Sequence, residues 1–473
     1  MTDDASRSDQ FGNFAEPPTP DHHLDGPSQD IQAIFRADDV PPAATLMERS
    51  SYVPENKPIA FSRYVDREFF DLETTKMWSR VWQMAIWSYD IPEPGDVYVY
   101  RNAGRSAIVV RQPDGSIKAF ENSCPHRGLE LCGEDTHVKQ IRCPYHAFTW
   151  NLEGQCKWIP AAWDFPQLDR DNFPLNEVRC EQWNGFVFVN FDNEAKPLST
   201  YLGKMIDQWK EWDFTKTRYR AVTAAKPCPA NWKAVMDAFI ETLHVSGTHP
   251  QAMPLSPDTS TQYDVWPDEP HFSRFHSLVG PHSPNMLTAP TEQQSLDAFT
   301  SMYLPEKFGT DDGELQPGEN TRKALARLSR EVYRERLGVD ASKTPEAELI
   351  DGTEYLIFPN FIIWPSYSNP LVYRFRPGED QNSSYWEISL FVPFDGERPP
   401  SGPVVKLDQE GSLSDVPGFD YLGDLLQQDV ENLRYIQNGM RASTRGSMNL
   451  SSYQEQRMRH YHQTIDKYIN GEL

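Results

Sequence analysis

Two short segments of the chain each pair a cysteine with a histidine. Cys124 and His126 stand in "CPHRG", and Cys143 and His146 stand in "CPYH", with sixteen residues between the pairs. A structural zinc site usually groups its ligands by type, as Cys-x2-4-Cys and His-x3-5-His. Mixed pairs instead suit a two-iron, two-sulfide cluster in which one iron keeps two thiolates and the other takes two imidazoles. The sequence therefore predicts an electron-transfer cluster on these four residues, with structural zinc as the alternative.

The remaining cysteines fall outside this pattern. Cys132 and Cys156 stand near the two pairs, and we interpret them as small buried thiols. Six cysteines in 473 residues are too few for a disulfide scaffold. Clustered cysteine and histidine in a reducing compartment indicate a metal before a disulfide, and we expect a cytoplasmic protein.

A second group of possible metal ligands stands in "NWKAVMDAFIETLHVSGTHP". At 100° per residue, Glu241 and His244 lie on one face of a helix. His249 falls about 140° from His244, so a straight helix would keep the two rings from meeting one ion. Gly247 and Pro250 both favour a break in the helix at this point. We expect the helix to unwind there, so that the imidazole of His249 can lie beside that of His244.

A carboxylate is the expected third ligand, because two histidines and one carboxylate on one face of Fe(II) leave room for dioxygen. In "YLGDLLQQDVENLRYIQNGM" an apolar stripe with steps of 4 and 3 contains Asp429 at its centre. The stripe consists of Leu422, Leu426, Asp429, Leu433, Ile436 and Met440. A buried carboxylate is costly unless it is paired or bound to metal. We predict that His244, His249 and Asp429 bind one Fe(II); the alternative is a rotated stripe and two unrelated histidines.

The cysteine–histidine pairs lie among short alternating stretches that turn signals separate, such as "DVYVYRNAG", "SAIVVRQPDGSIKAFEN" and "GFVFVNFD". This pattern predicts a small antiparallel β domain. Later apolar β stretches, "YLIFPNFIIW" and "SYWEISLFVPF", precede two helical segments at 421–441 and about 452–469. The polar region 283–345 is expected to form surface helices or a lid.

These patterns divide the chain into four parts. Few apolar residues recur in the acidic N-terminal part, so we expect it to be disordered, or ordered only against a partner. Helical spacing of aromatic residues follows it. The predicted parts are a tail at 1–50, a helical part of the later domain at 51–84, the β domain at 85–197 and a second metal-binding domain at 198–473.

The overall charge excludes some partners. The chain has 69 acidic and 45 basic residues, for a net charge of −24, which argues against nucleic acid or an anionic membrane surface. It contains no apolar run of about 18 residues, so we expect no membrane span. The N-terminus lacks the apolar segment of a secretory signal.

Together these residues resemble the large (alpha) subunit of a Rieske non-heme iron oxygenase, in the ring-hydroxylating dioxygenase family, over about residues 55–470. The resemblance implies an α+β fold with a small antiparallel β Rieske domain and a larger helix-grip catalytic domain with an antiparallel sheet. It also implies trimers, α3 or α3β3 with a small β subunit, in which the [2Fe–2S] cluster of one subunit feeds the iron of its neighbour. The family usually has glycine where this chain has Ala147, and we interpret the extra methyl as a packing detail.

The resemblance gives Glu241 a role, since the family has an acidic residue three positions before the first iron-binding histidine. That residue bridges the two centres across the subunit interface, and its free oxygen would reach His126 or His146 of the neighbour. Glutamate at this position resembles the branch that demethylates or monooxygenates, including members that act on quaternary ammonium compounds.

The implied function is a terminal oxygenase that hydroxylates or oxidatively demethylates an apolar, aromatic or N-methyl compound. Electrons would come from NAD(P)H through a separate reductase and ferredoxin, because the chain has no GxGxxG or flavin signature. The alternatives are a cis-dihydroxylating ring dioxygenase and, from another class, a Rieske electron carrier with a passive binding domain. The expected substrate pocket, in which "FPN" lies on a strand that crosses the cavity, is lined by Phe239, Leu243, Phe358, Asn360 and Phe361.

Overall fold

The computed structural model describes residues 26–303 and 313–473, and these residues form two compact units. The larger unit contains the described residues up to Asp66 together with Lys204–Thr464. The smaller unit contains Arg67–Gly203 and Ile465–Leu473. The helical stretch after Asp66 therefore groups with the β domain, whereas the sequence placed 51–84 with the catalytic domain. This stretch groups with the β domain because it leads directly into β2 (Gln83–Trp87), the first strand of the seven-stranded sheet.

The smaller unit is built on a seven-stranded antiparallel sheet in the order β2-β11-β10-β5-β4-β3-β6. Its strands are β2 Gln83–Trp87, β3 Asp96–Asn102, β4 Arg105–Arg111, β5 Ile117–Glu121, β6 Thr136–His137, β10 Glu177–Trp183 and β11 Phe186–Asn190. In β4, Ile108 and Val110 face one buried cluster while Ala107 and Val109 face another. Both faces of the strand are therefore buried, which accounts for its continuous apolar run.

A second, three-stranded antiparallel sheet carries the cysteine–histidine loops in this unit. Its strands are β7 Ile141–Arg142, β8 Thr149–Trp150 and β9 Cys156–Trp158. Helix α3 Arg67–Leu72 continues into a π-helical turn at Glu73–Trp78 before β2, and α4 is Leu198–Leu202. The predicted small antiparallel β domain is confirmed.

The larger unit is built on an eight-stranded sheet in the order β13-β14-β15-β16-β17-β18-β12-β19. Every neighbouring pair is antiparallel except β12 and β19, which are parallel. The strands are β12 Arg218–Cys228, β13 Gln262–Asp264, β14 Phe272–Ser277, β15 Gly352–Ile357, β16 Phe361–Ile363, β17 Leu371–Pro377, β18 Ser384–Pro393 and β19 Val404–Lys406. A two-stranded ribbon pairs β1 Ile59–Ala60 with β20 Ser447–Met448.

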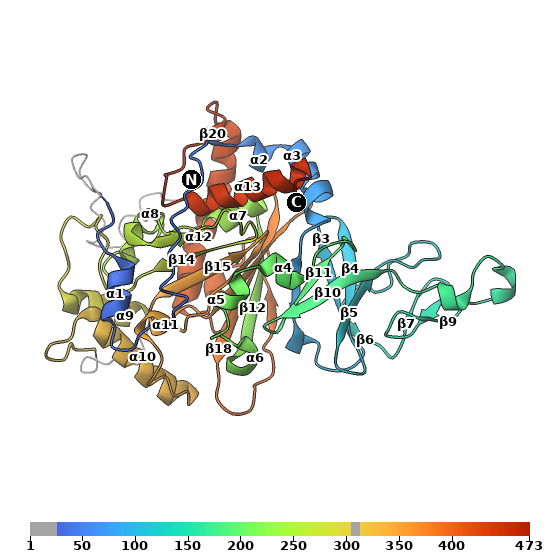
Figure 1. Cartoon of the computed structure of the whole chain (residues 1–473), viewed down its shortest axis with the longest axis horizontal. Helices are drawn as coiled ribbons and strands as arrows, with labels where there is room; N and C mark the ends of the chain where they lie inside the picture. The colour runs from blue at the N-terminus through green and yellow to red at the C-terminus, as the bar shows by residue number, and fades with distance from the viewer. Residues whose placement is uncertain (1–25, 304–312) are drawn as a thin grey trace. The chain divides into compact units, whose positions relative to one another are not determined.

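Helices cover this sheet and bring the candidate ligands to it. Helix α7 Trp232–Asp237 lies against β17 and β18, and the long helix α12 Tyr421–Ala442 packs on α7 (Figure 1). The other helices are α2 Ser62–Val65, α5 Met205–Gln208, α6 Phe214–Thr217, α8 Val245–Thr248, α9 Glu292–Tyr303, α10 Thr321–Leu337, α11 Glu346–Leu349 and α13 Gln456–Asn470. The sheet with helices gripped against it agrees with the predicted α+β class.

The N-terminal stretch is more ordered than its composition suggested. Residues 26–50 contain helix α1 Ile31–Ala37, which Asp30 caps through the backbone N–H groups of its first turn. Phe35 is fully buried, and Asp38 pairs with Arg322 of α10 at 2.7 Å. A few apolar side chains and one buried ion pair therefore hold a segment that is acidic on average. The first part of the predicted disordered tail, residues 1–25, lies outside the described residues.

The polar region after residue 283 contains α9 and α10. Leu325 and Leu328 of α10 are fully buried in a local core, so this helix is anchored on one face. Residues 304–312 lie outside the described part, so a lid there stays a prediction.

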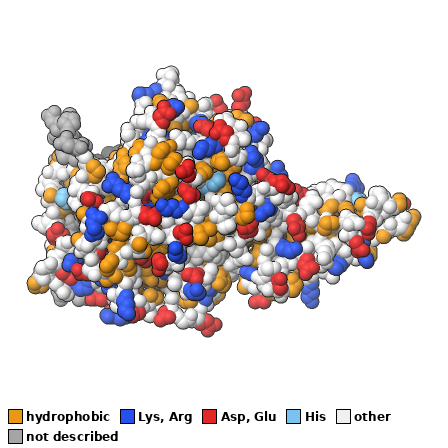
Figure 2. Space-filling view, in the orientation of Figure 1, with side chains coloured by type: hydrophobic (Ala, Val, Ile, Leu, Met, Phe, Trp, Pro, Cys, Tyr) orange, Lys and Arg blue, Asp and Glu red, His pale blue; other side chains and the backbone are white. Residues whose placement is uncertain are grey.

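Acidic and basic side chains are interspersed with apolar atoms over the face drawn in Figure 2. Among the described residues, no helix has both the length and the apolar character that crossing a membrane requires.

Candidate functional site

The two cysteine–histidine loops of the smaller unit are built alike. In each loop the cysteine carbonyl accepts a hydrogen bond from the fourth residue after it. Gly128 N–H donates to Cys124 O at 2.8 Å, and Ala147 N–H donates to Cys143 O at 3.0 Å. The cysteine N–H groups in turn donate to the carbonyl of the fifth residue after them, at 2.8 and 2.9 Å. Each loop is therefore a closed turn that its own backbone holds in shape.

Gly128 and Ala147 both have left-handed backbone angles, with φ of +78° and +65°. Glycine adopts this region without steric cost, whereas an L-residue with a Cβ atom loses about 1–2 kcal/mol there. The expectation that Ala147 is a packing detail is therefore wrong, because the extra methyl strains the backbone. The Thr149 hydroxyl donates to the Ala147 carbonyl at 2.8 Å and helps to hold the turn.

The cysteines and histidines of the two loops differ in solvent exposure. Cys124 and Cys143 are buried, while His126 and His146 are partly exposed. The two imidazole rings lie 4.8 Å apart between centroids. Burial raises the pKa of the Cys124 thiol, and the neighbouring Cys143 raises it further. Two adjacent buried sulfurs and two adjacent outer rings fit the ligand set of a [2Fe–2S] cluster with one thiolate iron and one imidazole iron.

In the larger unit, His244, His249 and Asp429 converge although 185 positions separate the first from the last. One ligand atom from each lies within 4.8 Å of the other two. His249 Nε2 is 3.2 Å and His244 Nε2 is 3.7 Å from Asp429 Oδ1. A buried carboxylate and two imidazole nitrogens aimed at one point fit a mononuclear Fe(II), as the sequence predicted.

The helix that was expected to carry Glu241 and His244 on one face is absent there. Helix α7 ends at Asp237, and His244 is the residue before α8. Between them Thr242 N–H donates to Tyr263 Oη at 2.9 Å, and the Ile240 carbonyl accepts from Arg457 Nη1 at 3.3 Å. Because tertiary partners satisfy these backbone groups, the chain needs no helical hydrogen bonds there.

The break was also expected at Gly247, which instead lies within α8. His249 follows α8 with φ −124° and ψ 55°, just before Pro250. A residue before proline avoids α geometry, so the end of α8 is where the sequence placed it. The rings of His244 and His249 meet with centroids 5.2 Å apart.

Glu241 supports His244 from behind. Its Oε1 accepts from His244 Nδ1 at 2.8 Å, and its Oε2 accepts from the backbone N–H groups of Leu243 and His244. Burial lowers the pKa of His244, but the Glu241 carboxylate outweighs it and raises the pKa to about 9. Both Glu241 oxygens therefore have partners within the chain, including the oxygen expected to reach a neighbouring subunit.

The stripe on α12 that predicted Asp429 is buried with one exception. Asp429 and the leucines at 422, 426 and 433 are buried, but Ile436 is 39% exposed. Gln437 is buried in its place and accepts from Asn231 N–H at 3.0 Å. A straight helix drifts by about 20° per heptad relative to a strict repeat of seven, so the buried face shifts gradually around the helix and Ile436 falls at its edge.

A hollow of about 450 Å³ borders this site in the larger unit. Glu241, His244 and Asp429 are among its polar lining residues, and Met440 and Met458 are among its apolar ones. Asp237 also lines it, and burial raises the pKa of that carboxyl to about 7. The five residues expected to contact substrate are not among those that line this hollow.

Those five residues belong to the packed interior or to its edge. The Phe239 ring packs against Trp386 with centroids 4.5 Å apart, and Leu243 is half-buried beside Glu241. Phe358 and Asn360 lie in the turn between β15 and β16, so "FPN" is a turn and not the expected strand. Phe361 is buried at the start of β16. Their contact with substrate stays a prediction.

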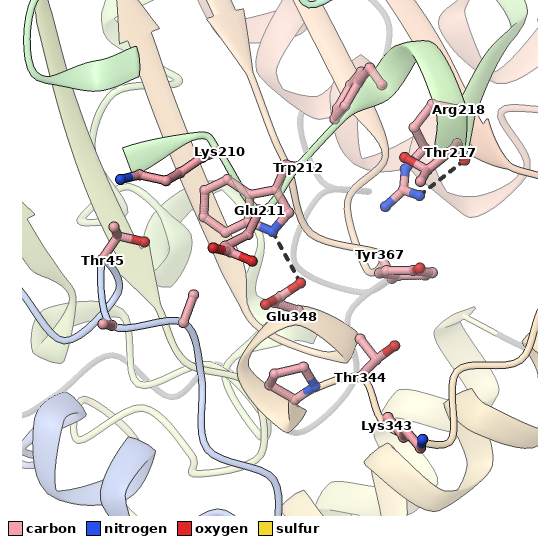
Figure 3. Close-up of a pocket in the computed structure, with 14 residues that line it drawn as sticks. Thr45, Lys210, Glu211, Trp212, Thr217, Arg218, Lys343, Thr344, Glu348 and Tyr367 are labelled. Carbon is pink, nitrogen blue, oxygen red and sulfur yellow. Dashed lines mark hydrogen bonds between the residues drawn. The ribbon is translucent and has the colours of Figure 1, made fainter. Parts of the chain in front are cut away.

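A second hollow of about 550 Å³ lies elsewhere in the larger unit (Figure 3). Trp212 Nε1 donates to Glu348 Oε2 at 3.1 Å, and burial raises the pKa of Glu348. The guanidinium of Arg218 stacks over the Tyr367 ring at 4.3 Å. Neither histidine nor cysteine lines this hollow, so it offers no counterpart to the metal-ligand sets above.

Two family models match the chain. Residues 207–471 match the ring hydroxylating alpha subunit (catalytic domain), and residues 81–169 match the Rieske [2Fe-2S] domain. The Rieske match contains both cysteine–histidine loops, and the catalytic match contains Glu241, both candidate histidines and Asp429.

Curated relatives have similar sequences over part of their length. The carnitine monooxygenase oxygenase subunit of Escherichia coli (strain K12) is 31% identical over 192 residues, which are 40% of this chain and 50% of the relative. The benzene 1,2-dioxygenase subunit alpha of Pseudomonas putida is 31% identical over 193 residues, 39% of this chain and 42% of the relative. The chain spans about half the length of the curated relatives it matches.

Solved structures share the fold at low sequence identity. A quaternary ammonium Rieske monooxygenase has a TM-score of 0.62 at 17% identity, with 87% of this chain and 95% of that chain covered. A naphthalene 1,2-dioxygenase has a TM-score of 0.59 at 20% identity, with 87% and 92% covered. These likenesses concern the fold alone.

Proposed function

Because the chain belongs to the family of ring hydroxylating alpha subunits and also contains a Rieske domain, we propose that it is the terminal oxygenase of an electron-transfer system. The observation that carries the proposal is the convergence of His244, His249 and Asp429 on one point. A Rieske electron carrier has no use for such a site, so this convergence disfavours the alternative of a passive binding domain.

In this proposal the chain's own residues hold two metal centres, the cluster and the mononuclear iron. Cys124, Cys143 and the two outer histidines hold the cluster, with the histidines nearer the surface, where an electron donor reaches them. His244, His249 and Asp429 hold Fe(II), which when bound supplies the centre for dioxygen activation. Glu241 accepts from His244 Nδ1, so the Nε2 lone pair of that ring is directed at the iron position.

Glu241 is also the residue that we propose for electron transfer between subunits. Its Oε1 has a second lone pair beyond the one that His244 uses, and it borders the hollow of about 450 Å³. In a trimer, the partner's cluster histidine would meet Glu241 in this hollow. Oε2 is less suited to the contact because it already accepts two backbone N–H groups.

For the substrate we propose an organic compound that is hydroxylated or loses a methyl group through hydroxylation of the adjoining carbon. Glutamate at position 241 and the similarity to the carnitine monooxygenase oxygenase subunit support N-methyl compounds. The similarity to the benzene 1,2-dioxygenase subunit alpha supports the second candidate, cis-dihydroxylation of an aromatic ring. Electrons would come from NAD(P)H through a ferredoxin, a reductase or both.

The experiment is product analysis with the iron-loaded protein and a surrogate reductase and ferredoxin. A panel of N-methyl and aromatic compounds is incubated under ¹⁸O₂, and the products are analysed by mass spectrometry. Formaldehyde with a demethylated amine supports the first candidate, and a diol with two ¹⁸O atoms supports the second. If no compound is oxidised while the reduced cluster remains stable under oxygen, the proposed oxygenase function is wrong.

A further inference from the structure

His249 is supported on its far side by a residue that the sequence did not single out. Gln428 precedes Asp429 on α12, and its Oε1 accepts from His249 Nδ1 at 2.7 Å. The same Oε1 accepts from Gln251 Nε2 at 2.8 Å. One amide oxygen thus receives two N–H donors from the segment that carries the second histidine.

The ligand position of His249 Nε2 determines the orientation of the Gln428 amide. A neutral imidazole whose Nε2 faces a metal carries its proton on Nδ1, and that N–H needs an acceptor, so the amide oxygen of Gln428 faces the ring. The Nε2 lone pair is then free, and Nε2 is the atom that lies 3.2 Å from Asp429 Oδ1.

The two histidines therefore differ in their support. A carboxylate, Glu241, accepts from His244, whereas a neutral amide, Gln428, accepts from His249. Asp429 and Glu241, the carboxylates that contact the two histidines, together offset the charge of a divalent cation at this point. A neutral residue at position 428 keeps that balance while it still orients the ring.

We propose that Gln428 is a positioning residue that holds His249 in the Nδ1–H tautomer, and that Gln251 holds Gln428 in turn. The inference rests on the proposed function only in taking the three residues as metal ligands. Neighbouring positions on α12 then have separate tasks, because Asp429 supplies a ligand atom and Gln428 orients another ligand. Hydrogen-bond partners of this kind typically change metal affinity 10- to 100-fold.

The test measures binding of Co(II) alone to the full-length protein after chelation of the mononuclear iron. Affinity is obtained by competition with a chromophoric chelator, and the absorbance of the cluster reports that the fold is intact. Gln428→Leu should weaken Co(II) binding about 10- to 100-fold. Gln428→Glu keeps the acceptor and adds a charge, so its affinity should equal or exceed that of the wild type.

Asn432→Ala is the matched control. Asn432 lies one turn beyond Gln428 on the same helix and donates to Thr248 Oγ1 at 3.1 Å, so it joins the same two segments through a residue that is not a candidate ligand. Its Co(II) affinity should stay within about threefold of the wild type, below the range for ligand-orienting partners. An equal loss in Asn432→Ala and Gln428→Leu would assign the effect to helix–loop packing and overturn the inference.

A second readout follows the tautomer itself. In the Co(II) protein, the Nδ1–H protons of both ligand rings should give exchangeable, paramagnetically shifted proton resonances. One of the two should broaden or vanish in Gln428→Leu and return in Gln428→Glu. Unchanged resonances and unchanged affinity in Gln428→Leu would overturn the inference.

The two proposals can fail separately. Wild-type protein that binds Co(II), loses it in Asp429→Ala and yet oxidises no compound would contradict the proposed function and leave the role of Gln428 standing. Wild-type protein that binds no Co(II) at this point would overturn the role of Gln428, whatever reaction the protein performs.

Discussion

The two candidate metal sites are assembled in opposite ways. The proposed cluster ligands fall within the 23 residues from Cys124 to His146, on two turns that their own backbone hydrogen bonds close. The proposed mononuclear ligands come from two segments 185 positions apart, and the side chains of Glu241 and Gln428 accept hydrogen bonds from the two histidines. The first site is therefore a local structure, whereas the second exists only when α12 packs beside the segment after α7.

The sites also differ in what surrounds the ligands. In the cluster loops the cysteines are buried and the histidines reach the surface of the smaller unit. At the mononuclear site Asp429 and His249 are buried, and the pKa of His244 is raised to about 9 by Glu241 against the effect of burial. A metal ion at this site must displace the proton of His244, so metal binding should weaken as the pH falls below about 9.

The largest effect is expected from Cys124→Ala, which breaks the local site. A cluster with three ligands should not persist, and the stability of the smaller unit should fall with it because metal binding and folding are coupled. The measurements are visible absorbance and acid-labile sulfide. Cys156→Ala is the control, since this thiol lies outside the ligand pattern. A full cluster in Cys124→Ala would contradict the assignment.

Asp429→Ala should break the second site and leave the first intact. The protein should keep its cluster spectrum, lose the mononuclear metal and form no product, because two imidazoles alone hold the ion weakly. Metal analysis and product assays check this. Asp424→Ala, at an exposed position on the same helix, should behave as the wild type. Retained metal and full activity in Asp429→Ala would show that this carboxylate is not a ligand.

Glu241→Gln should leave both metal sites intact and slow the electron transfer between them. The variant should accept electrons into the cluster and reoxidise it with substrate and oxygen about 10- to 100-fold more slowly. Glu241→Asp should lose less, since the charge remains. Single-turnover kinetics on the pre-reduced protein measure the effect. Reoxidation at the wild-type rate in Glu241→Gln would remove Glu241 from the electron path.

Acid should weaken the larger unit through Glu387 on β18. Burial raises the pKa of this carboxyl, but Arg374 and Arg376 outweigh it and lower the pKa from 4.5 to about 2. The stabilisation is fully present above pH 4.5 and is lost as the pH falls toward 2, with a limit of about 3 kcal/mol. Urea unfolding followed by tryptophan fluorescence should show a smaller loss over this range in Glu387→Gln. Equal slopes would contradict the assignment.

The smallest effect is expected from Ala147→Gly in the cluster loop. Glycine removes the strain of a positive φ, so the unfolding free energy of the smaller unit should rise by about 1 kcal/mol. Thermal loss of the cluster absorbance measures the gain. Gly128→Ala, at the equivalent position of the other loop, should lower stability by a similar amount. A loss of stability in Ala147→Gly would show that the methyl group has a packing role.

The sequence by itself predicted the candidate ligands whose signal is local. The cysteine–histidine spacing predicted one ligand set, and a carboxylate in the apolar stripe of α12 predicted Asp429, because helix period and ligand chemistry depend on near neighbours. Other features depended on distant contacts. Tyr263 and Arg457 hold the turn around Glu241, and Arg322 anchors the N-terminal segment.

Only the tertiary structure decided the partner of His249, and only the three-dimensional structure of the cluster turn revealed the strain at Ala147. Gln428 carries no signal in the sequence, since a glutamine on a helix is ordinary until packing brings an imidazole to its oxygen. The left-handed angle at Ala147 follows from closing the cluster turn, which no residue preference of alanine indicates. At Gln428 the deciding energy comes from contacts that form only after the chain has folded, whereas at Ala147 it comes from the local hydrogen bonds that close the turn.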